Sequence, residues 1–184
     1  MRYYLVSILT ALTILLASCA KGSEVDRLAY QDMSLQINAV FTLGDETVPA
    51  TLMLEAPEYD ENGRMLARDA VLTLGENSII SGVSFEFVGG EVYVSSGVLK
   101  IPIEDETLIE GISNIISLFC ISKEHYYSSE TVKLDGLECE RVVYINGDNR
   151  VEVTLDLTCM LPTDIVAVID GRTISADISM IRAE

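Results

Sequence analysis

Few residues of this chain belong to the types that carry out catalysis. His125 is the only histidine, so a histidine-rich zinc site is excluded. Acidic residues cluster at 58–61 and 104–106, and glycosidases use two carboxylates across a site, but a chain with 29 acidic residues offers such pairs by chance. The loop at 60–63 lacks the full spacing of a calcium-binding EF-hand. Because the nucleophile and phosphate-loop motifs are absent as well, we expect no enzyme activity, no metal and no cofactor.

The four cysteines are the remaining candidates for chemistry. Cys139 and Cys159 lie on the apolar faces of two expected neighbouring strands, offset by about one residue pair, so a disulfide between them depends on the strand register. In the alternative, which we favour, Cys120, Cys139 and Cys159 are buried thiols that pack as small apolar side chains. An odd number of cysteines leaves one thiol unpaired in either case.

Cys19 has a different context. Arg2 gives a positive start, and residues 5–17 form an apolar segment that is shorter than the about 20 residues needed to span a bilayer. The following Leu16-Ala17-Ser18-Cys19 resembles the bacterial lipobox. This resemblance implies cleavage before Cys19 and attachment of a diacylglyceryl group, usually with an N-acyl chain, to that cysteine. The alternatives are an ordinary signal peptide with an incidental cysteine and a short membrane anchor.

Charge and composition exclude several classes of protein. The 29 acidic and 12 basic residues give a net charge of −17, which excludes nucleic-acid binding through phosphate neutralisation. Anionic lipid headgroups repel such a surface, so the attached lipid must provide the membrane anchoring. With 49% hydrophobic and 22% charged residues the chain is neither disordered nor a coiled coil, and its 184 residues suit one domain.

Apolar and polar side chains alternate along most of the chain, with the period of a half-buried β-strand. This alternation predicts strands at about 34–43, 48–56, 66–74, 80–88, 91–95 and 97–103, and again at 130–134, 137–146, 150–158, 164–170 and 173–181. Short turns such as Gly89-Gly90 favour antiparallel pairing of consecutive strands.

Between the two groups of strands the apolar spacing becomes that of an amphipathic helix, over 106–122. Asp105 and Glu106 lie at its positive end, where acidic side chains are favourable. Gly111 inside the helix costs up to about 1 kcal/mol relative to alanine, so we expect a close backbone approach there.

These elements predict a mainly β (α+β) fold. It is a single, strongly curved antiparallel sheet of about eleven strands, an open half-barrel, with the helix on its concave face; a closed barrel or sandwich is the alternative. The candidate residues of a concave ligand cavity are Phe41, Leu52, Leu54, Phe85, Phe87, Ile112, Ile116 and Phe119. Residues 1–18 are the expected lipoprotein signal peptide, 19–30 the lipidated cysteine and tether, and 31–184 the β domain.

Several segments carry a family resemblance. In the last quarter, residues 151–157 are followed by Met160-Leu-Pro-Thr-Asp-Ile-Val and then Asp170-Gly-Arg, and earlier come Gly90-Glu-Val-Tyr-Val and Leu99-Lys-Ile-Pro-Ile. Together with the order of elements, these segments resemble the LolA-like lipoprotein-carrier superfamily. The chain departs from soluble carriers in its lipid anchor and its short N-terminal segment at 23–31. Lipid-anchored relatives include envelope lipid-transfer proteins and GerS-like sporulation and germination lipoproteins.

The resemblance implies a lipid-anchored binding protein on the extracytoplasmic face of the cell membrane. Its concave apolar face would hold a lipid acyl chain or an apolar element of a partner protein. The alternative is a non-carrying accessory lipoprotein that positions or activates a cell-wall enzyme of sporulation or germination. The expected partners are the membrane, through Cys19, and a lipid or an envelope protein, with no role for nucleic acid.

Overall fold

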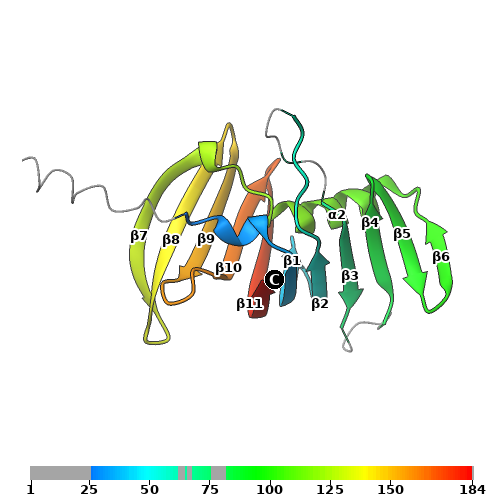
Figure 1. Cartoon of the computed structure of the whole chain (residues 1–184), viewed down its shortest axis with the longest axis horizontal. Helices are drawn as coiled ribbons and strands as arrows, with labels where there is room; N and C mark the ends of the chain where they lie inside the picture. The colour runs from blue at the N-terminus through cyan, green and yellow to red at the C-terminus, as the bar shows by residue number, and fades with distance from the viewer. Residues whose placement is uncertain (1–25, 62–64, 66–67, 76–81, 184) are drawn as a thin grey trace, which may run out of the picture.

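The computed structural model describes residues 26–61, 65, 68–75 and 82–183. Their eleven strands form one antiparallel sheet in the order β6-β5-β4-β3-β2-β1-β11-β10-β9-β8-β7 (Figure 1). Strands β6 and β7 are its two free edges, so the sheet is open. The predicted fold class is confirmed, and the closed-barrel alternative is wrong. The expected signal peptide and Cys19 lie outside the described residues.

All the strands predicted from the alternation are present. The first six are β1 (Leu35–Leu43), β2 (Glu46–Leu54), β3 (Ala70–Leu74), β4 (Ser84–Val88), β5 (Glu91–Ser96) and β6 (Leu99–Pro102). The last five are β7 (Tyr126–Leu134), β8 (Leu137–Asn146), β9 (Asn149–Asp156), β10 (Pro162–Ile169) and β11 (Arg172–Ala183). The first residues expected for the third and fourth strands lie partly outside the described residues.

Strands β1 and β11 pair with each other in the middle of the sheet, with Leu35 opposite Ala183. On one side of this pair, β1 to β6 follow each other as a meander, and on the other side β7 to β11 do the same. In Figure 1 the two meanders form the two wings of the molecule. The segment 103–125 connects the last strand of one wing to the first strand of the other.

The connecting segment contains helix α2 (Glu106–Ser117) and the short 3-10 helix η2 (Lys123–His125). The Asp105 carboxylate caps α2 by accepting a hydrogen bond of 2.9 Å from the backbone N–H of Leu108. The helix ends at Ser117 rather than at the predicted residue 122, because residues 118–120 form a tighter turn with bonds from the Phe119 and Cys120 N–H groups to the preceding turn. Among the described residues no helix is long and apolar enough to cross a membrane.

The expectation of a close backbone approach at Gly111 is wrong. A Cβ atom placed on Gly111 would meet only the Leu43 side chain, at an ordinary contact distance of 3.7 Å from Cδ2. Helix and sheet are therefore separated by side chains at this point, and the glycine is not needed for packing.

The core lies on one face of the sheet, under α2 and a second 3-10 helix, η1 (Ala29–Asp32). Cross-strand neighbours form continuous apolar rows on this face, one of which contains Phe41, Ala176, Ile165, Val153 and Val142. Ile112, Ile115 and Ile116 of α2 and the following Leu118 and Phe119 belong to the same cluster. Burial of this surface is the main source of stability for the fold.

Candidate functional site

The eight side chains predicted to line a concave cavity are all part of the core. Seven of them are buried, and Phe87 is partly buried against the same cluster. Leu52 and Phe41 are fully enclosed, as is Phe119, which follows α2. These residues therefore lie on the core face of the sheet, which α2 and the turn after it cover.

A cavity of about 610 Å³ opens at the margin of this covered face. Its walls come from Leu28, from Gln31 and Asp32 of η1, from Tyr59 and Met65, and from residues 120–124. We call this cavity the rim pocket. Leu28 and Ile121 line it and also belong to the core, so its apolar wall is continuous with the interior. None of the eight predicted side chains lines it.

Gln31 connects two walls of the rim pocket. It is only 2% exposed, its Oε1 accepts a bond of 3.1 Å from the backbone N–H of Ile121, and its Nε2 donates to the Tyr30 hydroxyl at 3.4 Å. Burial raises the pKa of Tyr30, which is therefore neutral. Leu28 and Tyr30 are both buried although they lie in the segment expected to be a tether. No local signal in the sequence identified this segment as part of the packed fold.

Arg68 lies behind the rim pocket and is 2% exposed. Its Nε donates to the Glu55 carbonyl at 2.8 Å, and its Nη2 donates to the Met33 carbonyl at 2.6 Å. Its Nη1 is buried and has no hydrogen-bond partner. These two bonds connect the residue after β2 and the segment before β1 to the segment before β3.

The thiol of Cys120, a wall residue of the rim pocket, lies against the Arg68 guanidinium. Burial raises the pKa of Cys120, and the neighbouring guanidinium offsets part of that rise. Burial also lowers the pKa of Arg68, while Cys120, Tyr59 and Asp32 oppose this shift. Tyr59 donates its hydroxyl to the Asp32 carboxylate, and both residues line the pocket.

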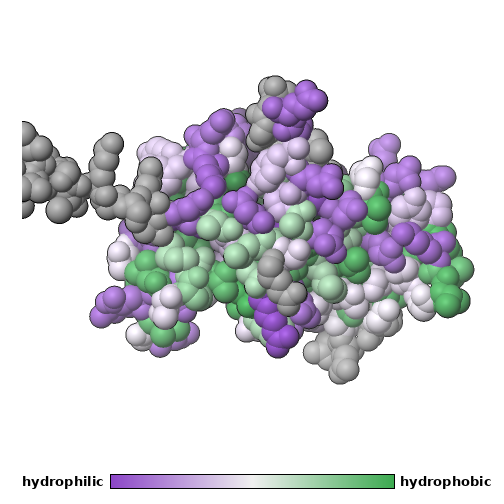
Figure 2. All heavy atoms as spheres, in the orientation of Figure 1, coloured by the Kyte–Doolittle hydropathy of each residue, from purple (hydrophilic) through white to green (hydrophobic). Residues whose placement is uncertain are grey.

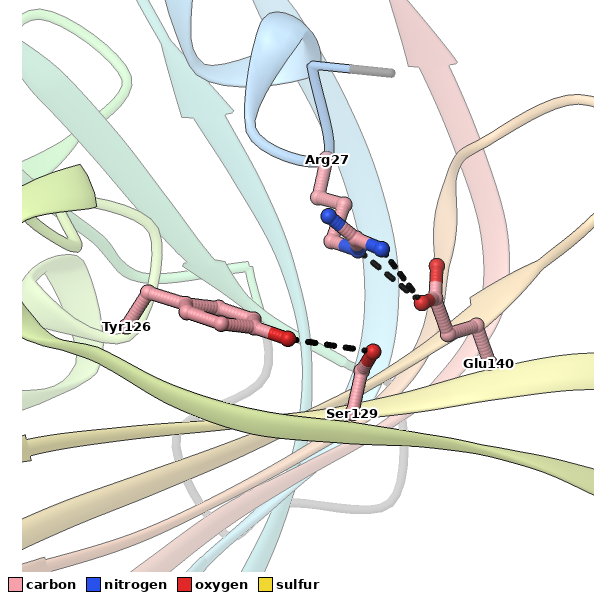
Figure 3. Close-up of polar contacts among 4 residues, drawn as sticks. All are labelled: Arg27, Tyr126, Ser129 and Glu140. Carbon is pink, nitrogen blue, oxygen red and sulfur yellow. Dashed lines mark hydrogen bonds and ion pairs between the residues drawn. The ribbon is translucent and has the colours of Figure 1, made fainter. Parts of the chain in front are cut away.

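A polar cluster connects the start of the described chain to strands β7 and β8 (Figure 3). Arg27 Nε and Nη2 both donate to Glu140 Oε1, at 2.9 and 2.8 Å. The Arg27 guanidinium lies over the Tyr126 ring, 5.5 Å from its centroid, and Tyr126 donates to Ser129 Oγ at 3.3 Å. Burial raises the pKa of Glu140, but bonds from Arg27 and Ser129 outweigh it and lower the pKa overall. The cluster fastens the segment leading into η1.

The other candidates for chemistry are dispersed. His125 lines a separate cavity of about 330 Å³ beside Tyr144, on the other side of Cys120 and Ile121. Among the described residues no group of three or more histidine, cysteine or acidic side chains is arranged to hold a metal ion. Residues 62 and 63 of the loop at 60–63 lie outside the described residues.

The three described cysteines are free thiols. Cys139 is buried on the face of β8 that points away from the core, opposite Asp156 of β9. Cys120 is partly buried, whereas Cys159 is exposed in the turn after β9. The expectation of buried thiols is therefore confirmed for Cys139 and wrong for Cys159, because β9 ends at Asp156 and the alternation does not continue to Cys159.

One free edge of the sheet exposes apolar side chains. In the β5–β6 hairpin Val98 is fully exposed, Leu99 is 58% exposed and Ile101 is 46% exposed. Figure 2 shows apolar atoms at this end of the molecule, over the strand labelled β6 in Figure 1. An edge strand with unpaired backbone groups and apolar side chains is a template for pairing with another chain.

No protein-family model and no curated protein matches the sequence. Three solved structures are similar to the chain in overall architecture. A chain of the Pseudomonas aeruginosa MucA/MucB complex is 16% identical with a TM-score of 0.44, over 86% of this chain and 55% of that one. The Mycobacterium tuberculosis lipoprotein LppX is 13% identical with a TM-score of 0.40, over 85% of this chain and 95% of that one. A DUF1329 family protein from Desulfovibrio piger is 13% identical with a TM-score of 0.39, over 86% of this chain and 88% of that one.

Proposed function

We propose that this chain is a non-catalytic, lipid-anchored envelope protein that binds an amphipathic ligand in the rim pocket. The observation that carries the proposal is the pocket itself: its volume of about 610 Å³ lies within the about 300–1,000 Å³ typical of small-molecule sites. Leu28 and Ile121 connect its apolar wall to the core, while Gln31 and Lys123 give it a polar side. Such a site suits a molecule with an apolar chain and a polar end.

The anchoring part of the proposal rests on the lipobox-like Leu16-Ala17-Ser18-Cys19. Lipidated Cys19 would attach the protein to the extracytoplasmic face of the cell membrane. The family part, a LolA-like domain of the GerS-like type, rests on the sequence resemblance given above. Because α2 covers the concave face, an acyl chain would enter at the rim pocket rather than lie along the open sheet.

Native mass spectrometry of the full chain, extracted from bacterial membranes in detergent, tests ligand binding. We expect a co-purified lipid mass on the wild-type protein. Ser122 is an exposed wall residue, so Ser122→Trp fills the pocket without removing a core side chain and should abolish the bound mass. Ser128 is an exposed serine of β7 outside the pocket, and Ser128→Trp should retain the ligand. Retention of the same mass by both variants would exclude the rim pocket as the site.

A second function is favoured by the exposed apolar edge of β6: an accessory role in which this strand pairs with an extended apolar segment of an envelope protein. Cross-linking from the wild-type chain should then give a defined partner, and Ile101→Lys should abolish the cross-link. Val40→Lys changes an exposed valine of the central strand β1 and serves as the matched control. Loss of the cross-link with both variants would argue against pairing at the edge.

A further inference from the structure

Among the described residues, no carboxylate forms an ion pair with Arg68. Its two hydrogen-bonded partners, the carbonyl groups of Glu55 and Met33, are neutral. The seven ion pairs found among the described residues do not include Arg68. A buried charge is normally paired, because removing it from water is costly. With Nη1 also lacking a partner, this guanidinium has both an unneutralised charge and an unused donor.

The groups nearest to the guanidinium do not neutralise it. Cys120 is a neutral thiol at physiological pH, since its burial raises the pKa. The Asp32 carboxylate accepts a hydrogen bond from the Tyr59 hydroxyl and acts on Arg68 only through its charge, without forming an ion pair with it. Cys120, Asp32 and Tyr59 all face the rim pocket. Arg68 itself does not line the pocket, and its guanidinium interacts with these three wall residues from behind them.

We infer that Arg68 receives the anionic group of the ligand, a carboxylate or a phosphate, from the rim pocket. This inference rests on the proposed function and specifies its ligand: an acyl chain with an anionic end rather than a neutral lipid. A guanidinium donates charge-assisted hydrogen bonds to both groups, and they are among the strongest that proteins make. The inference also explains why an arginine is buried in a protein whose net charge is −17. Acidic side chains at the surface would repel an anion that was bound closer to the solvent.

Four soluble probes separate the anion from the chain: octanoate, octyl phosphate, 1-octanol and inorganic phosphate. Their dissociation constants are measured on the full chain in phosphatidylcholine nanodiscs, with empty nanodiscs as the blank. We expect octanoate or octyl phosphate to bind at least about tenfold more tightly than 1-octanol, the effect of one hydrogen bond to a charged group. Arg68→Gln should remove this preference and Arg68→Lys should retain part of it. Arg150→Gln, which changes an exposed arginine of β9, should leave the preference unchanged.

The outcomes distinguish this inference from the proposed function. Equal binding of octanoate, octyl phosphate and 1-octanol would retain the proposed function and overturn the anion inference. Binding of inorganic phosphate alone would support the anion site and overturn the proposed binding of a chain. Absence of binding by all four probes would overturn both.

A measurement on the unmodified chain avoids dependence on an Arg68 variant that fails to fold. Cys120 and Cys159 are both free, and only Cys120 lines the rim pocket. Octanoate bound there should slow alkylation of Cys120 severalfold, as followed by peptide mass spectrometry, and leave Cys159 unaffected. If 1-octanol protects Cys120 as well as octanoate does, or if octanoate protects both cysteines equally, the inference is wrong.

Discussion

Asp164 of β10 lies directly opposite Asp177 of β11, so two carboxylates share one position on the face of the sheet away from the core. Burial raises the pKa of Asp164, and Asp177 and Glu152 raise it further, while Arg141 of β8 opposes them. Thr154 of β9 lies between Arg141 and Asp164 in the same cross-strand row. Repulsion between the two carboxylates therefore destabilises the folded protein at this row.

Replacing Asp164 by asparagine should therefore stabilise the protein at pH 7. A carboxyl group whose folded pKa is raised loses stability as the pH increases through that pKa, because its charged form is disfavoured in the fold. We expect Asp164→Asn to increase the free energy of unfolding by about 0.5 kcal/mol after solvent screening. Urea denaturation should show this gain at pH 7 and its loss below the ordinary pKa of 3.8. Asp148→Asn removes the same charge from an exposed turn and should have little effect.

Glu140 should have the opposite dependence on pH, since its folded pKa is lowered. Such a group contributes stability above its unfolded pKa and loses it as the pH falls through the folded value. Glu140→Gln should cost roughly 0.5–1 kcal/mol at pH 7, the range of a well-formed ion pair. The difference from wild type should close as the pH falls below the ordinary value of 4.5. Glu138, on the same strand and 67% exposed, provides the control Glu138→Gln, and an equal effect there would contradict the role of Arg27.

Two glycine-to-alanine changes should have opposite signs. Gly111→Ala should raise the free energy of unfolding by up to about 1 kcal/mol, because alanine has a higher helix propensity than glycine. The added Cβ meets only Leu43 Cδ2, at 3.7 Å. Gly75→Ala should cost about 1–3 kcal/mol, because its Cβ would lie 2.9 Å from the backbone oxygen of Pro49, which cannot move aside alone. Thermal unfolding of both variants under identical conditions tests the pair. A destabilised Gly111→Ala would show that α2 packs more tightly than its contact with Leu43 indicates.

Cys19→Ala should abolish lipid attachment. In cells given a fatty-acid analogue, the wild-type chain should be labelled and should migrate about 2 kDa below its precursor, the mass of roughly 18 residues removed with the signal. The variant should be neither labelled nor cleaved at that bond. Labelling that persists in Cys19→Ala would show that another cysteine is modified and would contradict the lipoprotein assignment.

The strands could be predicted from the sequence because the alternation within each strand depends only on which of its two faces is buried. In β1, residues 35, 37, 39 and 41 are buried and alternate with residues that are polar except for the exposed Val40. The end of α2 was predicted too late, because Leu118 and Phe119 continue the apolar spacing while their backbone has already left the helix.

The rim pocket has no comparable signal. Gln31 meets Ile121 from 90 positions away, and Arg68 meets Met33 from 35 positions away. Arg68 falls within the strand predicted at 66–74, and nothing in its neighbouring residues distinguishes a buried arginine from a solvent-exposed one. Its burial follows only from the positions of η1 and the segment after α2, which are set by the packing of the whole sheet.

The pairing of β1 with β11 also has a consequence for how the chain folds. Within each wing, paired strands are consecutive in sequence, so their pairing closes only a short loop of chain. Strands β1 and β11 come from opposite ends of the described chain, so their pairing closes the longest loop. Loop-closure entropy therefore favours early formation of the two meanders and late joining along this central seam. Until the seam forms, Phe41 and Ala176 each have a neighbour on one side only, Val48 and Ile165, and the unpaired edges of β1 and β11 are exposed in the half-folded chain. Aggregation during synthesis would then start from the centre of the finished sheet.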